Sequence, residues 1–173
     1  LLQERYVDVE VKVFARGGTA AMPGELLRTH TSCSHVSTSN FTSCSYRDSP
    51  DFAAACAYSK QADLTVVMLG TNDAKEHAAV LEGSYGKALT EILLSLGGNL
   101  ILLDPPDTAR PSLYLPESLA VVHRVIGKVA GDLGIPSVSL TGPLPAVRKE
   151  LRVDGVHFAL PACVIGAKAL LSA

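Results

Sequence analysis

The sequence has no tryptophan, few aromatic residues (5%) and few charged ones (18%, against about a quarter in an average soluble domain). It has no excess of basic residues, because 15 Lys and Arg stand against 17 Asp and Glu and leave a net charge of −2. Nucleic-acid-binding proteins normally carry a basic patch or stripe, so this balance argues against that class. Long hydrophobic runs are missing too: the stretch Leu64–Leu69 is far shorter than the ~20 residues that cross a bilayer. The sequence therefore predicts neither a nucleic-acid partner nor a transmembrane segment.

What remains is an apolar, mildly acidic chain. Its hydrophobic fraction of 47% excludes a disordered protein, and 173 residues fit one domain over 1–173. The low charge fraction favours a surface that is partly covered by a protein partner. The sequence begins with Leu1 and shows no charged-then-apolar signal peptide, and it indicates no compartment.

Strands and helices are expected to alternate along the chain. Residues 7–14 alternate apolar and charged side chains, which is typical of an edge strand with one wet face. The branched, apolar runs Leu64–Leu69 and Leu100–Leu103 predict strands buried on both faces, and Ile135–Leu140 predicts a shorter, half-polar strand. Helices are expected from Pro50 (capped by Ser49) to Lys60, and over Ser84–Leu96, Glu117–Leu133 and Pro161–Ala173.

This alternation is typical of an α/β fold with a parallel sheet between two layers of helices, a three-layer, flavodoxin-like sandwich. Thr31–Ser45 is rich in Ser and Thr and is expected to form a long surface loop.

The first polar cluster, Gly70-Thr71-Asn72-Asp73, follows the most apolar predicted strand directly. Sites in open α/β sheets form at the carboxyl ends of strands. A glycine there allows close approach of a ligand, and an asparagine amide can donate to a developing oxyanion. An Asx turn explains the same residues without any function.

The second cluster, Asp154-Gly155-Val156-His157, precedes the last predicted helix. A carboxylate three residues before an imidazole can accept its N–H, fix one tautomer and stabilise the imidazolium. A capping aspartate beside a surface histidine is the alternative interpretation.

Taken together, the two clusters resemble the SGNH (GDSL-type) hydrolase family: Gly-x-Asn-Asp after a buried strand, then Asp-x-x-His about eighty residues later. The stretch from Phe14 to Thr19 also looks like the family's second strand and its loop glycine, and Leu100–Pro106 like its next strand and proline-rich loop. The likeness extends over nearly the whole chain.

The resemblance implies hydrolysis of small acyl esters through a serine acyl-enzyme, with no cofactor or metal. His157 is implied as general base and Asp154 as the residue that orients it. Asn72 and the backbone N–H of Gly18 (or Gly17) are implied as oxyanion donors, and Gly70 keeps the Asn72 loop tight.

One departure from the family concerns the nucleophile. The family's serine lies in a Gly-Asp-Ser motif after a first strand that sits between the strands matching 7–14 and Leu64–Leu69, and these 173 residues contain no Gly-Asp-Ser. Two explanations are left open. Either a segment upstream of Leu1 supplies the serine, or the protein is a catalytically inactive, SGNH-like structural subunit of a larger assembly.

Other chemistry receives little support. The candidate nucleophiles Ser32, Cys33, Ser34 and Cys44 lie in the Ser/Thr-rich stretch, with nothing to place them near His157. A Cys33–Cys44 bridge and reduced thiols both fit four cysteines. No metal-ligand spacing and no phosphate-binding glycine motif is present. His77 and His123 are expected on helix surfaces or just before helices.

Overall fold

The computed structural model describes residues 10–27, 43–108, 110, 112–143, 151, 154, 156–159, 163–166 and 168. Its main sheet has the strand order β3-β4-β5, formed by Thr65–Val67, Leu100–Asp104 and Ser137–Ser139. All pairings are parallel, with Val66 opposite Ile101 and Leu103 opposite Val138. A second, two-stranded parallel sheet joins β1 (Thr19–Ala20) to β2 (Cys44–Ser45).

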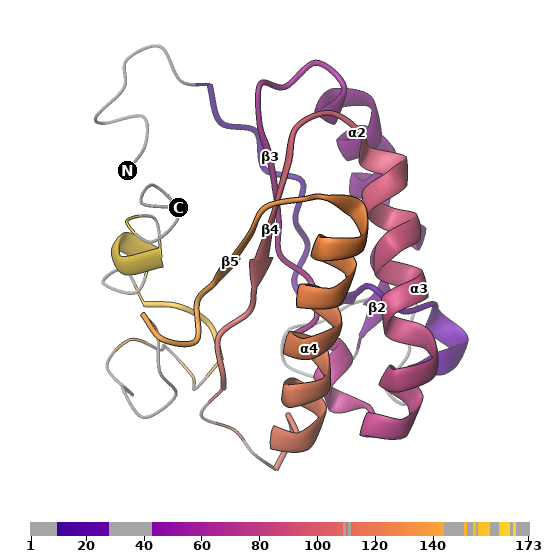
Figure 1. The fold of residues 1–173 in the computed structure, drawn as a ribbon, viewed down its shortest axis with the longest axis vertical. Helices are drawn as coiled ribbons and strands as arrows, with labels where there is room; N and C mark the ends of the chain where they lie inside the picture. Colours follow the sequence, from indigo (N-terminus) through magenta and orange to yellow (C-terminus); the bar gives the residue numbers. More distant parts are fainter. Residues whose placement is uncertain are drawn as a thin grey trace.

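Three α-helices connect and cover the main sheet. They are α2 (Pro50–Ser59), α3 (Ala78–Leu96) and α4 (Pro116–Leu133), and they lie side by side on one face of β3, β4 and β5 (Figure 1). Both α2 and α4 begin with proline, whose fixed φ suits the first helical turn. Helix α4 ends at Gly134 in the left-handed conformation. Short 3₁₀ turns are found at Gly24–Leu26 (η1), Tyr46–Asp48 (η3) and Asp73–Lys75 (η4).

The apolar core is divided between the two faces of the sheet. On the helical face, Val67, Leu102 and side chains of α3 and α4 form one large buried cluster. Leu103 has the opposite orientation because side chains alternate along a strand. It packs with Leu140, Leu151, Phe158 and Ile165 in a second, smaller cluster. The α/β fold with a parallel sheet flanked by helices is thus confirmed.

Several predicted boundaries were wrong. The helix expected from Ser84 starts at Ala78, and Ser49 stands at the start of α2 without a capping bond from its side chain. Residues 10–14 form no strand, because no neighbouring strand pairs with them in the described structure.

The strand at 64–69 is also shorter and less buried than expected. Only Thr65–Val67 is paired, β3 is an edge strand among the described residues, and Leu64, Val66 and Met68 are 48%, 42% and 41% exposed. Within the expected loop Thr31–Ser45, Cys44 and Ser45 form β2, whereas residues 31–42 lie outside the described structure. Most of the predicted helix Pro161–Ala173 also lies outside it, although 163–166 is helical. Among the described helices, none is both long and apolar enough to span a membrane.

Candidate active site

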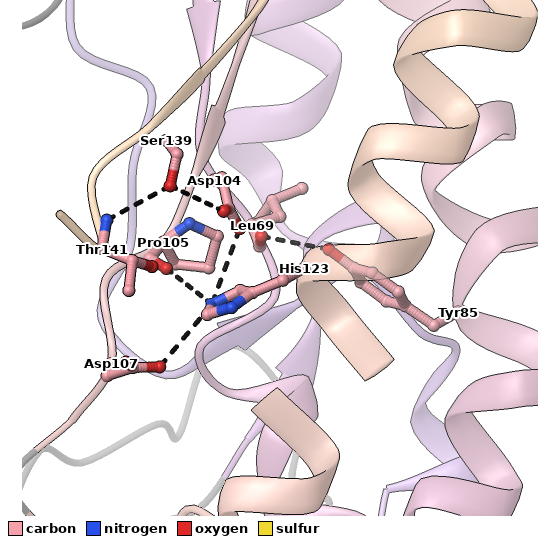
Figure 2. A network of polar contacts seen from close by, with 8 residues as sticks. All are labelled: Leu69, Tyr85, Asp104, Pro105, Asp107, His123, Ser139 and Thr141. Atoms are coloured by element: carbon pink, nitrogen blue, oxygen red, sulfur yellow. Dashed lines mark hydrogen bonds and ion pairs between the residues drawn. The ribbon is translucent and has the colours of Figure 1, made fainter. Parts of the chain in front are cut away.

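The residues of the first predicted cluster follow β3 and pack closely against the helices. Gly70 has φ +120°, and a Cβ at this position would lie 2.6 Å from both Tyr85 Oη and Val122 Cγ1. Tyr85 Oη also donates to the carbonyl of Leu69 over 3.1 Å (Figure 2). The chain therefore needs glycine here to pack against side chains of both α3 and α4.

Asn72 is joined to the segment that contains Gly18. Its Nδ2 donates to the carbonyl oxygen of Thr19 over 3.0 Å, which leaves the second Nδ2 hydrogen for another acceptor. Gly18 has φ +81°, and its carbonyl accepts the N–H of Cys44 over 3.0 Å. Among the described residues, no acceptor is found for the Gly18 N–H itself. The structure thus brings Asn72 and the Gly18 segment together.

The Asp154–His157 pair has the geometry that its spacing predicts. Asp154 Oδ2 lies 2.8 Å from His157 Nδ1, and Oδ1 accepts the backbone N–H groups of His157 (2.8 Å) and Val156 (3.0 Å). Desolvation is the largest single effect and opposes the ionisation of Asp154, but these hydrogen bonds and the His157 ring together outweigh it and lower the pKa of Asp154 to about 2. An ionised carboxylate only accepts, so Nδ1 carries the proton and Nε2 is left as a base. The His157 side chain is 64% exposed, so water and substrate can reach it.

Tyr114 interacts electrostatically with Lys75 of η4 and with Asp154 of the second cluster. The Nζ atom of Lys75 is 5.6 Å from the centroid of its ring. Burial and, in addition, the negative charge of Asp154 raise the pKa of Tyr114. The backbone N–H of Leu115 donates to the carbonyl of Ala74 over 3.2 Å, which fixes this segment on the Asn72 loop. In the described structure, however, no hydrogen bond joins Asn72 to His157.

Two groups of residues were not predicted from the sequence. The first is the buried run Asp73, Lys75 and Glu76, each at most 2% exposed, of which only Asp73 belongs to a predicted cluster. Burial, against the attraction of Glu76 and Asp73, lowers the pKa of Lys75 to about 8. The local sequence gives no signal of this burial, because charged side chains normally face water.

The second group surrounds His123, which is half-buried rather than on the surface. Its Nε2 lies 2.9 Å from the carbonyl of Pro105 and 3.6 Å from Asp104 Oδ1 (Figure 2). Ser139 Oγ donates to Asp104 Oδ2 over 3.1 Å, and burial raises the pKa of Asp104. These contacts fasten the segment after β4 to α4 and β5. A polar residue directly after a predicted strand was the available signal for Asp104.

The cysteine candidates receive no support as nucleophiles. Cys44 is disulfide-bonded and so offers no thiolate, while Cys56 and Cys163 are free. Ser32, Cys33 and Ser34 lie outside the described residues. In the part of the chain that is described, no three His, Cys, Asp or Glu side chains gather in a way that holds a metal ion.

Comparison with known proteins identifies the fold. The chain resembles the lipase/acylhydrolase from Enterococcus faecalis, with a TM-score of 0.55 and 20% identity over 65% of this chain and 61% of the other. It also resembles the acetylxylan esterase Axe2 from Geobacillus stearothermophilus (TM-score 0.51, 21% identity, 65% of this chain, 59% of the other). A catalytic serine mutant of Axe2 matches with a TM-score of 0.55 and 21% identity over 70% of this chain and 65% of the other.

These matches span less than two thirds of the length of each of those chains. No family model matches the sequence, and no curated protein matches it. The chain therefore has an SGNH-like hydrolase fold, as the two sequence clusters predicted.

Proposed function

We propose that the protein is a serine-type ester hydrolase that acts on small acyl esters through an acyl-enzyme. The observation that carries the proposal is the Asp154–His157 pair, in which one carboxylate accepts both the backbone N–H and the ring Nδ1–H of the same histidine. This double contact fixes ring orientation and tautomer, and both are requirements for a general base in acyl transfer.

The catalytic residues have distinct roles in the proposed reaction. A serine Oγ attacks the ester carbonyl carbon and its proton passes to His157 Nε2. The second Nδ2 hydrogen of Asn72 and the N–H of Gly18 stabilise the oxyanion, and Gly70 keeps the Asn72 loop in place. His157 then gives the proton to the departing alcohol. Water attacks the acyl-enzyme, again with His157 as base, and releases the carboxylic acid and the serine.

The proposed reaction needs a serine nucleophile, but the 173 residues contain no Gly-Asp-Ser motif that could supply it. The proposal assigns it to a segment upstream of Leu1, seated beside β3, where no strand is paired on the outer edge among the described residues. Catalytic mutants of Axe2 support this arrangement: they replace a serine near the start of that chain, an aspartate, and a histidine three residues after the aspartate. Asp154 and His157 have the same spacing.

The test is turnover of p-nitrophenyl acetate by the natural protein, together with covalent labelling by a serine-directed fluorophosphonate. We expect His157→Ala to lower kcat by at least ~10³-fold, since it removes the base. His77→Ala, which replaces an exposed histidine at the start of α3, is the matched control and should leave kcat unchanged. Undiminished turnover in His157→Ala would overturn the mechanism.

The alternative function is a catalytically inactive, SGNH-like subunit of a larger assembly. The exposed apolar side chains Leu64, Val66 and Met68 favour it, because they form a ready contact surface for a protein partner. This alternative predicts no fluorophosphonate labelling of the natural protein and a stable complex in sedimentation. A serine adduct that depends on His157 would exclude it.

A further inference from the structure

Both carboxylate oxygens of Asp73 accept hydrogen bonds to which the proposed mechanism assigns no role. Its side chain is completely buried, with Oδ2 accepting the N–H of Ala21 and Oδ1 accepting the N–H of Met22, each over 2.9 Å. Both donors lie just after Gly18, on a segment about fifty residues away in sequence. The two oxygens of one carboxylate thus bind two consecutive amides of the segment that supplies an oxyanion donor.

Two neighbouring side chains bind the same small sheet. Asn72 Nδ2 donates to Thr19 O over 3.0 Å, and Lys75 Nζ donates to Ser43 Oγ over 3.1 Å. Because Thr19 of β1 pairs with Cys44 of β2, these contacts hold both strands against η4 and the residue before it. The position of Gly18 relative to the Asn72 amide is therefore set by residues 72–75.

We propose that Asp73, as a carboxylate, is a positioning residue that holds the Gly18–Met22 backbone so that the Gly18 N–H and the Asn72 amide face one oxyanion. This inference rests on the proposed esterase function. Only the ionised group can accept both N–H bonds with full strength. An asparagine, or a protonated carboxyl, offers one good acceptor and turns a donor toward the other amide.

The surroundings make the ionisation of Asp73 sensitive to pH. Burial raises the pKa of Asp73 to about 6, against the bonds from Ala21 and Met22, and the charge of Glu76 raises it further. Lys75 from η4 and Tyr85 from α3 are the other titratable groups that interact with it. The two hydrogen bonds that Asp73 accepts from Ala21 and Met22 should therefore weaken as the pH falls through about 6.

The decisive variant is Asp73→Asn in the natural protein. We expect kcat for p-nitrophenyl acetate at pH 7.5 to fall ~10- to 100-fold, because a displaced oxyanion donor is felt in the transition state. KM should change less than about twofold, since the ester ground state makes little use of that donor. Ser118→Ala is the matched control. It removes another buried hydrogen bond, from Ser118 Oγ to Glu76 O, without touching the Gly18 segment, and should leave kcat unchanged while lowering Tm.

A second measurement is independent of catalysis. In nuclear magnetic resonance spectra of the wild type, the Ala21 and Met22 amide protons should be shifted downfield, exchange slowly and titrate together with a midpoint near pH 6. In Asp73→Asn both amides should lose this protection, whereas Ser118→Ala should retain it. If the wild type hydrolyses no ester, the proposed function fails while the amide signals still decide the holding role. Unchanged amide protection and unchanged kcat in Asp73→Asn, or wild-type amides that do not titrate, would overturn the inference.

Discussion

At Gly70, both the backbone conformation and the packing exclude a side chain. Its φ of +120° is strained for any L side chain, and the space for a Cβ is already filled by Tyr85 Oη and Val122 Cγ1, each at 2.6 Å. Val122 lies in the middle of α4 and Tyr85 is fully buried, so neither can move away easily. A side chain here must displace the Asn72 loop or push the helices apart.

Gly70→Ala should therefore lower the free energy of unfolding by ~2–4 kcal/mol, measured by urea denaturation. Gly127→Ala is the control: Gly127 is an exposed glycine inside α4, with open space around its Cβ. Because alanine is the better helix former, that change should stabilise the protein by ~0.5–1 kcal/mol. Equal effects of the two substitutions would contradict the close packing around Gly70.

The buried carboxylate of Asp73 makes stability depend on pH. Its pKa of about 6 in the folded protein lies above the ordinary value of 3.8, so the folded state binds the proton more tightly than the unfolded state. The contribution of Asp73 to stability is then fully present below pH ~4 and is lost as the pH rises through 6. The difference corresponds to roughly 3 kcal/mol.

Urea denaturation from pH 4 to pH 7.5 tests this linkage. The stability of the wild type minus that of Asp73→Asn should fall by roughly 3 kcal/mol over that range, because asparagine does not titrate. A constant difference would show that Asp73 has an ordinary pKa. The ionised state thus lowers stability at neutral pH, and it is also the state that binds both Ala21 and Met22.

At the scale of elements, local sequence predicted α4 and β4 closely, but it missed the start of α3 and predicted a strand at residues 7–14. Proline at the start, a 3.6-residue apolar pattern and a terminal glycine are signals within one segment, and α4 followed them to within one residue. A strand depends on a partner that is distant in sequence. The alternation at residues 7–14 therefore predicted a strand that residues 10–14 do not form, since nothing pairs with them in the described structure.

The main sheet has one face that is well covered and one that is covered only in part. Leu102, at the centre of β4, is fully buried under the helices, whereas Val66 on β3 is 42% exposed on the other face. Leu102→Ala should accordingly lower the free energy of unfolding by ~2–5 kcal/mol, and Val66→Ala should lower it by about 1 kcal/mol or less. Thermal and urea unfolding of both variants measure this contrast. A cost for Val66→Ala as large as that for Leu102→Ala would show that β3 is covered in solution.

At the scale of the whole molecule, the sequence predicted both halves of the candidate site but not their surroundings. Gly-x-Asn-Asp and Asp-x-x-His are short motifs, and the bond of Asp154 to His157 lies within one of them. The contacts of Asn72 and Asp73 with residues 19–22 cross about fifty residues, so no local pattern specifies them. The covered surface predicted from the low charge fraction stays a prediction, and the exposed apolar side chains Leu64, Val66 and Met68, in and beside β3, are where it can be tested.

The two halves of the site also rest on cores of unequal size. Asn72 borders the large cluster of α3, α4, β3 and β4, in which Ala74 and Leu89 are fully buried. Of the two neighbours of His157, Val156 packs against the large cluster, whereas Phe158 packs in the small one, in which only Leu140 and Leu151 are buried among the described residues. Segments held by few buried contacts open at lower free energy than the global core.

The His157 segment touches the large cluster only through the partly buried Val156, so it should detach before the helices unfold. In a urea titration, the folded-state ring signals of His157 in nuclear magnetic resonance spectra should vanish at a lower urea concentration than the circular dichroism signal at 222 nm. Phe158→Ala should move the first transition to still lower urea and leave the second in place, since it weakens only the small cluster. Leu89→Ala should move the second transition to lower urea. It opens a cavity in the large cluster, which should lower the free energy of unfolding by ~2–5 kcal/mol. Coincident transitions that respond equally to both variants would mean that the two clusters unfold as one cooperative unit.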